Sequence, residues 1–123
     1  MNTIEIKSTS NRVLFTYTCE GNTIKKTVEV AVSRGISLSF ADLRNADLSD
    51  IRLSHADLSF ADLSGVNLCT TNLDCTELTC AKLIKANLSY SRLHNADLRN
   101  ADLREVNLSG VNLSGANLHG TKF

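Results

Sequence analysis

The sequence predicts an all-β solenoid, in which short units of similar sequence wind around one narrow core. The first observation is a leucine at every fifth position from Leu38 to Leu118, with Phe123 in the next place. The second is a small or β-branched residue two positions before each of them, such as Ala41 and Ala61. A period of five fits neither an α-helix, near 3.6 residues per turn, nor a flat strand, with a period of two. Each unit therefore forms one short side and a turn of a solenoid.

The composition bounds the class of protein. The 123 residues are enough for one domain, and Lys+Arg and Asp+Glu balance at 13 each. We therefore expect no direct binding of nucleic acid or of a membrane. No apolar run approaches the roughly eighteen residues of a membrane span, and no segment is typical of a signal peptide. The 4 cysteines lack the spacing of a disulfide framework, which favours reduced thiols and a cytoplasmic location.

The first element is a predicted β-hairpin in residues 1–35, which lie outside the repeat. Ile4–Ile6 alternates apolar and polar residues, and Val13–Thr18 is rich in residues that favour strands. Thr9–Asn11 supplies the turn residues between them. This segment is too small to bury a core alone, so we expect it to cap the first coil of the solenoid.

The second element is a predicted helix over roughly Ile24–Arg34. Asn22 or Thr23 can act as its N-cap, and the apolar residues of the segment, Val28 among them, recur at helical spacing. Gly35 is a typical stop signal. The predicted organisation is thus a ββα cap over residues 1–35 followed by one cooperative repeat unit over residues 36–123.

The repeat itself reads small–polar–Leu–polar–polar from Ile36 onward. Six units show it most clearly: Ala41-Asp42-Leu43, Ala46-Asp47-Leu48, Ala61-Asp62-Leu63, Ala86-Asn87-Leu88, Ala101-Asp102-Leu103 and Ala116-Asn117-Leu118. This pattern resembles the pentapeptide repeat family, whose motif is A-(D/N)-L-x-x, over about 88 of the 123 residues. The resemblance implies a right-handed quadrilateral β-helix with four units per coil. It also implies about four and a half coils, each stacked at roughly 4.8 Å on the next.

Four units per coil make residues twenty apart stacking neighbours. Leucines and small residues then fill the interior and leave no lumen for a ligand. On one side the inward column contains no alanine: it consists of Ile51, Thr71, Ser91 and Val111. We expect that side to bulge or to pack differently from the other three.

Acidic side chains gather on one half of the expected rod. The candidates for partner binding are Asp57, Asp62, Asp97 and Asp102, which precede leucines on two adjacent sides. One interpretation is that Asp and Asn fix the turns through hydrogen bonds to the backbone. The other is an acidic stripe that mimics DNA, since some members of the family are DNA mimics that inhibit DNA gyrase. Three arginines and a lysine among the acids argue against that second interpretation.

An exposed aromatic pair is the other candidate for partner binding. Phe40 and Phe60 occupy the same outward position one coil apart, so their rings are expected to stack on the surface. We expect the N-terminal hairpin or helix to fold over this pair. The alternative is that the pair anchors a partner.

No pattern in the sequence is typical of an enzyme. Cys69, Cys75 and Cys80 diverge around the coil, so no metal site is expected, and Cys75 and Cys80 are too far apart for a disulfide. The serines have no convergent histidine and acid, and no phosphate loop or dinucleotide motif occurs. We expect no catalytic residue, no cofactor and no metal.

Two function hypotheses follow. The first is a non-enzymatic scaffold that binds an unknown protein partner through the outer faces of the β-helix. The alternative is a DNA-mimic inhibitor of a DNA-handling enzyme such as DNA gyrase or a nuclease. By family resemblance, the short capped array also indicates a phage or mobile-element product.

The last coil predicts self-association. It presents an apolar disc, ringed by open strand edges, that consists of Leu108, Leu113, Leu118 and Phe123. A two-fold contact would cover two discs at once, and gyrase-inhibiting members of the resembled family dimerise through this end. We expect a homodimer through the C-terminal ends. The alternative is a monomer whose Phe123 ring folds over its own last coil.

Overall fold

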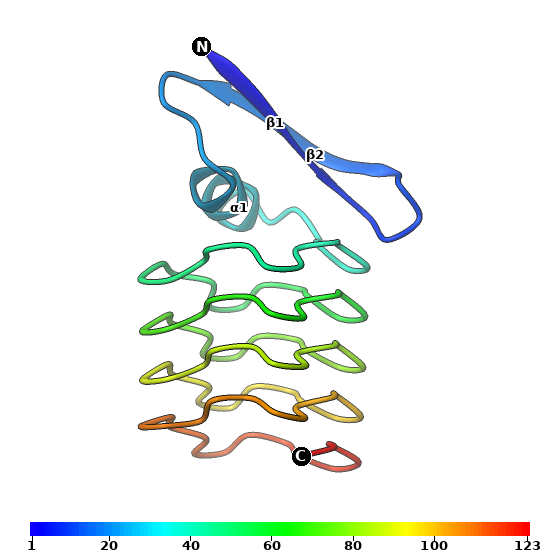
Figure 1. Ribbon diagram of the computed structural model, residues 1–123, viewed down its shortest axis with the longest axis vertical. Helices are drawn as coiled ribbons and strands as arrows, with labels where there is room; N and C mark the ends of the chain where they lie inside the picture. The colour runs from blue at the N-terminus through cyan, green and yellow to red at the C-terminus, as the bar shows by residue number, and fades with distance from the viewer.

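The computed structural model describes residues 1–123, which form a hairpin, a helix and a stack of similar turns (Figure 1). Strands β1 (Asn2–Lys7) and β2 (Val13–Cys19) make an antiparallel pair, and helix α1 (Ile24–Ser33) follows. The hairpin and α1 lie over the first turn of the stack, and the C-terminus lies at the opposite end. At 10 residues, α1 is too short to cross a membrane, and the structure has no other helix that would.

The hairpin packs on α1 through one face of its two strands. Ile4 is paired with Tyr17 and Ile6 with Phe15, and the register shifts just after Ile6. Arg34 is the C-cap residue of α1, and its guanidinium lies 5.8 Å from the ring centre of Phe15 and 5.5 Å from that of Tyr17. These cation–π contacts attach the end of the helix to the second strand.

Local chemistry explains where α1 begins and ends. The side chain of Thr23 accepts a hydrogen bond from the backbone N–H of Lys26 at 3.0 Å, so Thr23, and not Asn22, is the N-cap. Val28 is fully buried on the face toward the coil and hairpin. The helix ends at Ser33, and Gly35 takes a positive φ of 72°, the conformation that stops a helix.

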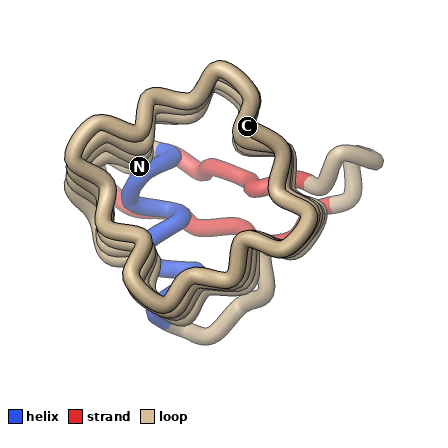
Figure 2. The backbone as a smooth tube through the Cα atoms, turned by 90° about the horizontal axis from the view of Figure 1, so that it is seen from below, coloured by secondary structure: helices blue, strands red, loops and turns tan.

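The repeat region is a coil with twenty residues per turn. Its β-bridges join residues twenty apart, as in the ladder from Asp42 to Asp62, Lys82 and Asp102. Because each unit has five residues, each turn has four sides. Viewed along the axis, successive turns superimpose on one closed outline (Figure 2). The amide of Leu58, for example, donates to the Glu77 carbonyl at 2.9 Å.

The core is a set of leucine columns lined by small residues. Every repeat leucine from Leu38 to Leu103 is at most 2% exposed, and most of the alanines are as well buried. Burying one such leucine stabilises the fold by about 1.5–3 kcal/mol. The prediction that leucines and small residues fill the interior is confirmed.

The side without alanine does not bulge, but its interior packs differently, which is the second of the two expected outcomes. Its ladder keeps the same twenty-residue spacing from Arg52 to Asn72 and Arg92. What differs is the interior, because two hydroxyl groups are buried there. Thr71 donates to the Leu48 carbonyl at 2.7 Å, whereas Ser91 Oγ has no hydrogen-bond partner. The regular ladder is retained because both side chains are small enough to fit the alanine position.

Candidate functional site

The corners of the coil decide which side chains project outward. Two residues follow each leucine, and the next N–H donates back to the leucine carbonyl, as Ala61 does to Leu58 at 3.1 Å. The second corner residue has a positive φ in every repeat from Phe40 (66°) to Gly120 (74°). Glycine and asparagine tolerate this conformation, whereas it costs other residues about 1–2 kcal/mol. Any other residue at this position therefore has a strained backbone conformation.

The Asp or Asn before most leucines fixes the corner that follows. Its Oδ1 accepts a hydrogen bond from the backbone N–H two residues further on, as Asp62 does from Ser64 at 3.1 Å. The same bond is made by Asp42, Asp47, Asp57, Asn67, Asn72, Asn87, Asp97, Asp102, Asn107, Asn112 and Asn117. The first interpretation of these residues is thus confirmed, since they are parts of the turns.

Phe40 and Phe60 form a stacked pair on the surface. Their ring centroids are 5.0 Å apart, with planes inclined by 10°. The two residues are 51% and 48% exposed, and both have positive φ. The expectation that the hairpin or helix folds over the pair is wrong. The pair is strained and apolar, and half of its area faces solvent, a combination that the coil itself does not require.

The turn of the hairpin lies beside this pair without covering it. Thr9 N–H donates to the Phe40 carbonyl at 2.9 Å, and Asp42 N–H donates to the Lys7 carbonyl at 2.8 Å. Ser8 also forms an antiparallel bridge with Ala41. These backbone bonds hold the turn at the edge of the first coil, where it projects beyond the outline of the repeats (Figure 2). The turn is therefore a ledge next to the aromatic pair.

Residues of this ledge line two small cavities. The one beside Phe40 has a volume of about 230 Å³ and is lined by Ser8, Ser10, Arg12, Leu14, Ser39 and Phe40. The one beside Phe60 has a volume of about 220 Å³ and is lined by Thr9, Asp42, Arg44, Phe60, Asp62 and Lys82. We call the aromatic pair, the ledge and these two cavities the Phe corner.

Two of the acidic candidates are neutralised within their own repeats. Arg99 Nη2 donates to Asp97 Oδ2 at 2.6 Å, and Arg104 Nη2 donates to Asp102 Oδ2 at 2.6 Å. In each pair the arginine Nε donates to Oδ1 at 2.9 Å. These hydrogen bonds hold the pKa of both carboxyls below the usual value. Neither residue presents a free negative charge.

The other two acidic candidates differ from each other. Asp62 Oδ2 lies 4.0 Å from Arg44 Nε. Asp57 has no basic partner, but accepts hydrogen bonds from the hydroxyls of Ser59 at 2.6 Å and Ser37 at 2.8 Å. Partial burial opposes ionisation of Asp57, but these bonds outweigh it, so its pKa is lowered. The structure thus does not join the four candidates into one continuous acidic stripe.

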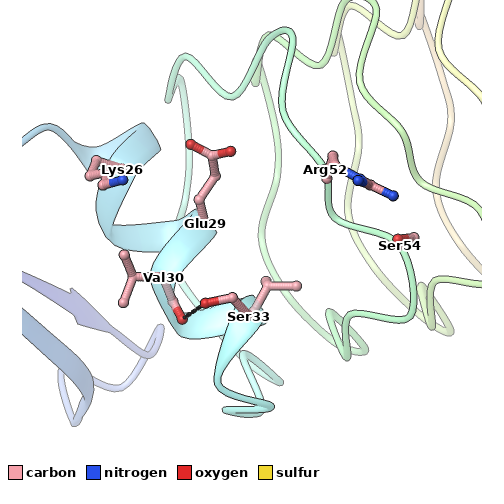
Figure 3. A pocket seen from close by; sticks show the side chains of 7 residues that line it. Lys26, Glu29, Val30, Ser33, Arg52 and Ser54 are labelled. Carbon is pink, nitrogen blue, oxygen red and sulfur yellow. Dashed lines mark hydrogen bonds between the residues drawn. The ribbon is translucent and has the colours of Figure 1, made fainter.

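The largest cavity lies elsewhere, between α1 and the coil, and has a volume of about 440 Å³. Figure 3 shows Lys26, Glu29, Val30 and Ser33 on the helix side and Arg52 and Ser54 on the coil side. Its charged side chains include both signs, and none of them forms an ion pair with another. It has neither an apolar wall nor a convergent set of polar groups, which a ligand site requires.

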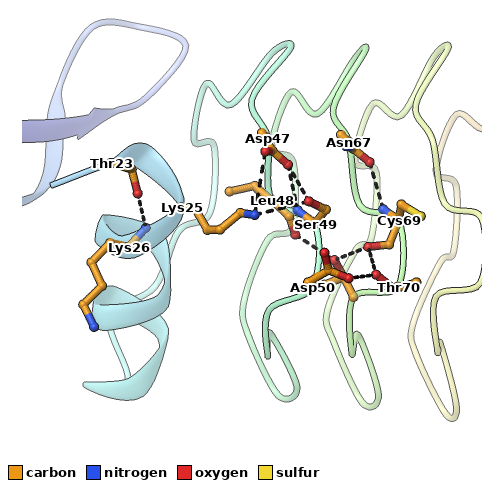
Figure 4. Close-up of polar contacts among 11 residues, drawn as sticks. Thr23, Lys25, Lys26, Asp47, Leu48, Ser49, Asp50, Asn67, Cys69 and Thr70 are labelled. Atoms are coloured by element: carbon orange, nitrogen blue, oxygen red, sulfur yellow. Dashed lines mark hydrogen bonds and ion pairs between the residues drawn. The ribbon is translucent and has the colours of Figure 1, made fainter. Parts of the chain in front are cut away.

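Polar contacts beside that cavity attach α1 to the coil (Figure 4). Lys25 Nζ donates to Ser49 Oγ at 3.2 Å and lies 3.7 Å from Asp47 Oδ2. The hydroxyl of Ser49 donates to Asp47 Oδ1 at 2.7 Å. These contacts occupy the exposed groups of the first coil on this side, so they have a structural role.

The cysteines and other reactive side chains are dispersed. Cys19, Cys69, Cys75 and Cys80 are all free thiols and partly buried. The structure brings together no three His, Cys, Asp or Glu side chains in a group that could hold a metal ion.

The C-terminal turn of the coil is open. Leu108, Leu113 and Leu118 are only partly buried, and Phe123 is 64% exposed. The backbone N–H groups of all four have no backbone partner, unlike those of the leucines above them. Contrary to the alternative expectation, the Phe123 ring does not fold closely over the last coil.

Comparison with known proteins assigns the family. The chain matches the family described as pentapeptide repeats, in 8 copies, over residues 36–74, 51–89 and 91–123. The chain belongs to the pentapeptide repeat family. Pentapeptide repeat proteins of known structure form right-handed β-helices. No curated protein matches this pentapeptide repeat protein.

Solved structures of other pentapeptide repeat proteins resemble this one. HetL from the cyanobacterium Nostoc sp. strain PCC 7120, a protein involved in the regulation of heterocyst differentiation, is 37% identical, with a TM-score of 0.61. The match covers 65% of this chain but only 39% of HetL. Rfr23 from the cyanobacterium Cyanothece 51142 is 35% identical with a TM-score of 0.33, and the match covers 69% of this chain and 65% of Rfr23. The protein alr5209 from Nostoc PCC 7120 is 29% identical with a TM-score of 0.42, over 78% and 92% of the two chains.

Proposed function

We propose that this pentapeptide repeat protein is a non-enzymatic scaffold that binds a protein partner at the Phe corner. The scaffold is a four-sided β-helix of about four and a half coils, closed at its N-terminal end by the hairpin and α1. The observation that carries this proposal is the stacked, half-exposed pair of Phe40 and Phe60 at positions with positive φ. Asparagine would satisfy these corners with less strain, as Asn45, Asn95 and Asn100 do at the same position of other repeats. Aromatic side chains there are expected to be retained for contact with a partner.

Affinity capture from host-cell lysate with matched variants tests this proposal. The double variant Phe40→Asn/Phe60→Asn removes the aromatic pair, and Tyr90→Asn removes an exposed aromatic from another corner as the control. We expect both variants to melt at or above the temperature of the parent, because Asn relieves the corner strain. Proteins captured by the parent and by Tyr90→Asn should be absent with the double variant. A captured set that is identical for all three proteins would contradict the proposal.

DNA mimicry is the alternative function, and the charges support it less. Asp97 and Asp102 are each held by an arginine, so the surface lacks the regular free negative charges that a DNA backbone presents. Supercoiling and nuclease-protection assays with the purified protein separate the two functions. We expect no inhibition by the parent. Inhibition that disappears in the variant Asp57→Asn/Asp62→Asn/Asp97→Asn/Asp102→Asn would favour mimicry instead.

We also propose that the 123-residue chain forms a two-fold homodimer through its open turn. Leu118 and Phe123 would lie at the centre of the contact, with Leu108 and Leu113 around them, because this surface is apolar and its backbone amides are unpaired. Light scattering at micromolar concentration should give twice the mass of the chain. Phe123→Asp should give a monomer, whereas Phe40→Asp should remain dimeric. A parent protein that is monomeric at that concentration would exclude this dimer.

A further inference from the structure

We propose that the Phe corner is a docking site for an acidic peptide segment that carries an apolar side chain. This inference rests on the function proposed above, which it deepens by naming the chemistry of the partner. Three observations lead to it: the size of the cavities, the exposure of the aromatic rings, and the distribution of unpaired charges around them.

The size of the cavities favours side chains over a whole ligand. At about 230 and 220 Å³, the two cavities fall below the usual range of about 300–1,000 Å³ for small-molecule sites. Residues of the ledge line both cavities, Thr9 in one and Ser8, Ser10 and Arg12 in the other, so one peptide segment along the ledge could place one or two side chains in each. This arrangement fits a peptide segment rather than a cofactor.

The rings require an apolar contact. Phe40 and Phe60 stack on each other at 5.0 Å, so each ring covers one face of the other. About half of each residue remains exposed, and each ring lines one of the two cavities. An apolar or aromatic side chain set against these rings would remove the exposed area from water, which is the energetic role of a binding hot spot.

The side chains that line the two cavities carry more positive than negative charge. Arg12 lines the cavity beside Phe40, Lys82 lines the cavity beside Phe60, and both are exposed and form no ion pair. Two carboxylates also line the second cavity, but both lie within ion-pair distance of Arg44, which donates to Asp42 at 2.8 and 2.9 Å. Three cations, Arg12, Arg44 and Lys82, thus face two carboxylates in the linings of the two cavities, which leaves a net charge of +1.

Two acids without a basic partner line a different cavity. Asp57 and Glu77 line a separate cavity with His55 and Val32 that includes neither phenylalanine. They have no basic partner. They would repel an acidic segment from that separate cavity. The net positive charge of the two cavities beside the aromatic pair therefore favours an acidic segment there.

Selection from an unbiased phage-displayed library of random dodecapeptides tests this inference. The library is panned on the 123-residue protein, and enriched peptides are synthesised for affinity measurements with the parent and the variants. Arg12→Gln/Lys82→Gln removes the two free cations, and Arg52→Gln, an exposed cation lining the cavity beside α1, is the matched control. Thermal melts of all variants establish that each is folded.

We expect enriched peptides with Asp or Glu next to an apolar residue. Their binding should weaken at least about tenfold with Phe40→Asn/Phe60→Asn and roughly threefold or more with Arg12→Gln/Lys82→Gln. It should be unchanged with Arg52→Gln, and should weaken as salt is raised. Neutral or basic peptides that still need the aromatic pair would overturn the acidic chemistry and leave the proposed function standing. Peptides indifferent to the pair, or no enrichment at all, would overturn both.

Discussion

Replacing Leu78 by Asp is expected to abolish folding of the coil. Leu78 has no exposed area, and its stacking neighbours twenty residues away on either side, Leu58 and Leu98, are also fully buried. A carboxylate there would lie among leucines with no group to pair with, and the cost of burying it exceeds the stability of a typical domain. The far-ultraviolet circular dichroism of the variant should resemble that of an unfolded chain, with no cooperative transition in denaturant.

Leu78→Ala gives the graded form of the same prediction. The cavity left by the missing atoms should lower the free energy of unfolding by about 2–5 kcal/mol in denaturant titrations. Leu118→Ala is the matched control, because Leu118 occupies the same column in the open last turn and is only partly buried. It should cost clearly less. Parent-like melting of both Leu78 variants would mean that Leu78 is not inside and that the β-helix is wrong.

The interior of this fold could be predicted because the leucine position of the repeat has the same buried environment in successive units. Every repeat leucine meets the same environment, so a period of five leads directly to a column such as Leu58–Leu78–Leu98, whose members are all fully buried. The same reasoning places Phe40 above Phe60, since the corner position also repeats every twenty residues. Periodicity predicts these contacts well because each residue packs against the residue at the equivalent position of the next coil.

The position of the hairpin turn could not be predicted in this way. It is held by backbone hydrogen bonds from Thr9 to Phe40 and from Asp42 to Lys7. Such bonds do not depend on the side chain, so the residue types do not predict them. For that reason the aromatic pair was expected to be covered, and the contribution of Arg12 to the Phe corner was missed. The only available signal was the cluster of turn residues at Thr9–Asn11, which predicts a turn but not the surface against which it rests.

The sequence also does not predict which carboxylate pairs with each arginine. Arg44 has a carboxylate in its own repeat, Asp42, and another one coil below, Asp62; the sequence alone does not rank them. The structure shows the local pair at 2.8 Å and the stacked one at 4.0 Å. Asp42 is the nearer one because its Oδ1 accepts the backbone N–H of Arg44 itself, whereas Asp62 accepts that of Ser64. The acidic half of the rod is therefore less negative than a count of its acids indicates.

Because of the turn-fixing carboxylates, the stability of the fold is expected to decrease at acidic pH. The pKa values of Asp42, Asp97 and Asp102 are lowered chiefly by hydrogen bonds from the following arginine, and that of Asp47 by Ser49. An unfolded chain has Asp pKa values near about 3.9, so below that pH the unfolded state takes up protons first. The stabilisation is fully present above that pH and is lost as pH falls through the folded-state values. The melting temperature should be flat from pH 7 to about 5 and fall below about 4.

The repeat contains its own control for this effect, because Asn occupies the same position in other units. Asn67 and Asn87 make the same bond to the backbone as the aspartates do, yet carry no titrating group. The variant Asp42→Asn/Asp97→Asn/Asp102→Asn should therefore keep its turns and melt close to the parent at pH 7, since exposed ion pairs contribute little. Between pH 7 and pH 3, the melting temperature of the variant should decrease less than that of the parent. Equal losses in the two proteins would mean that acid acts elsewhere, whereas a large loss at pH 7 would show that the arginine pairs, and not the turn bonds, hold the corners together.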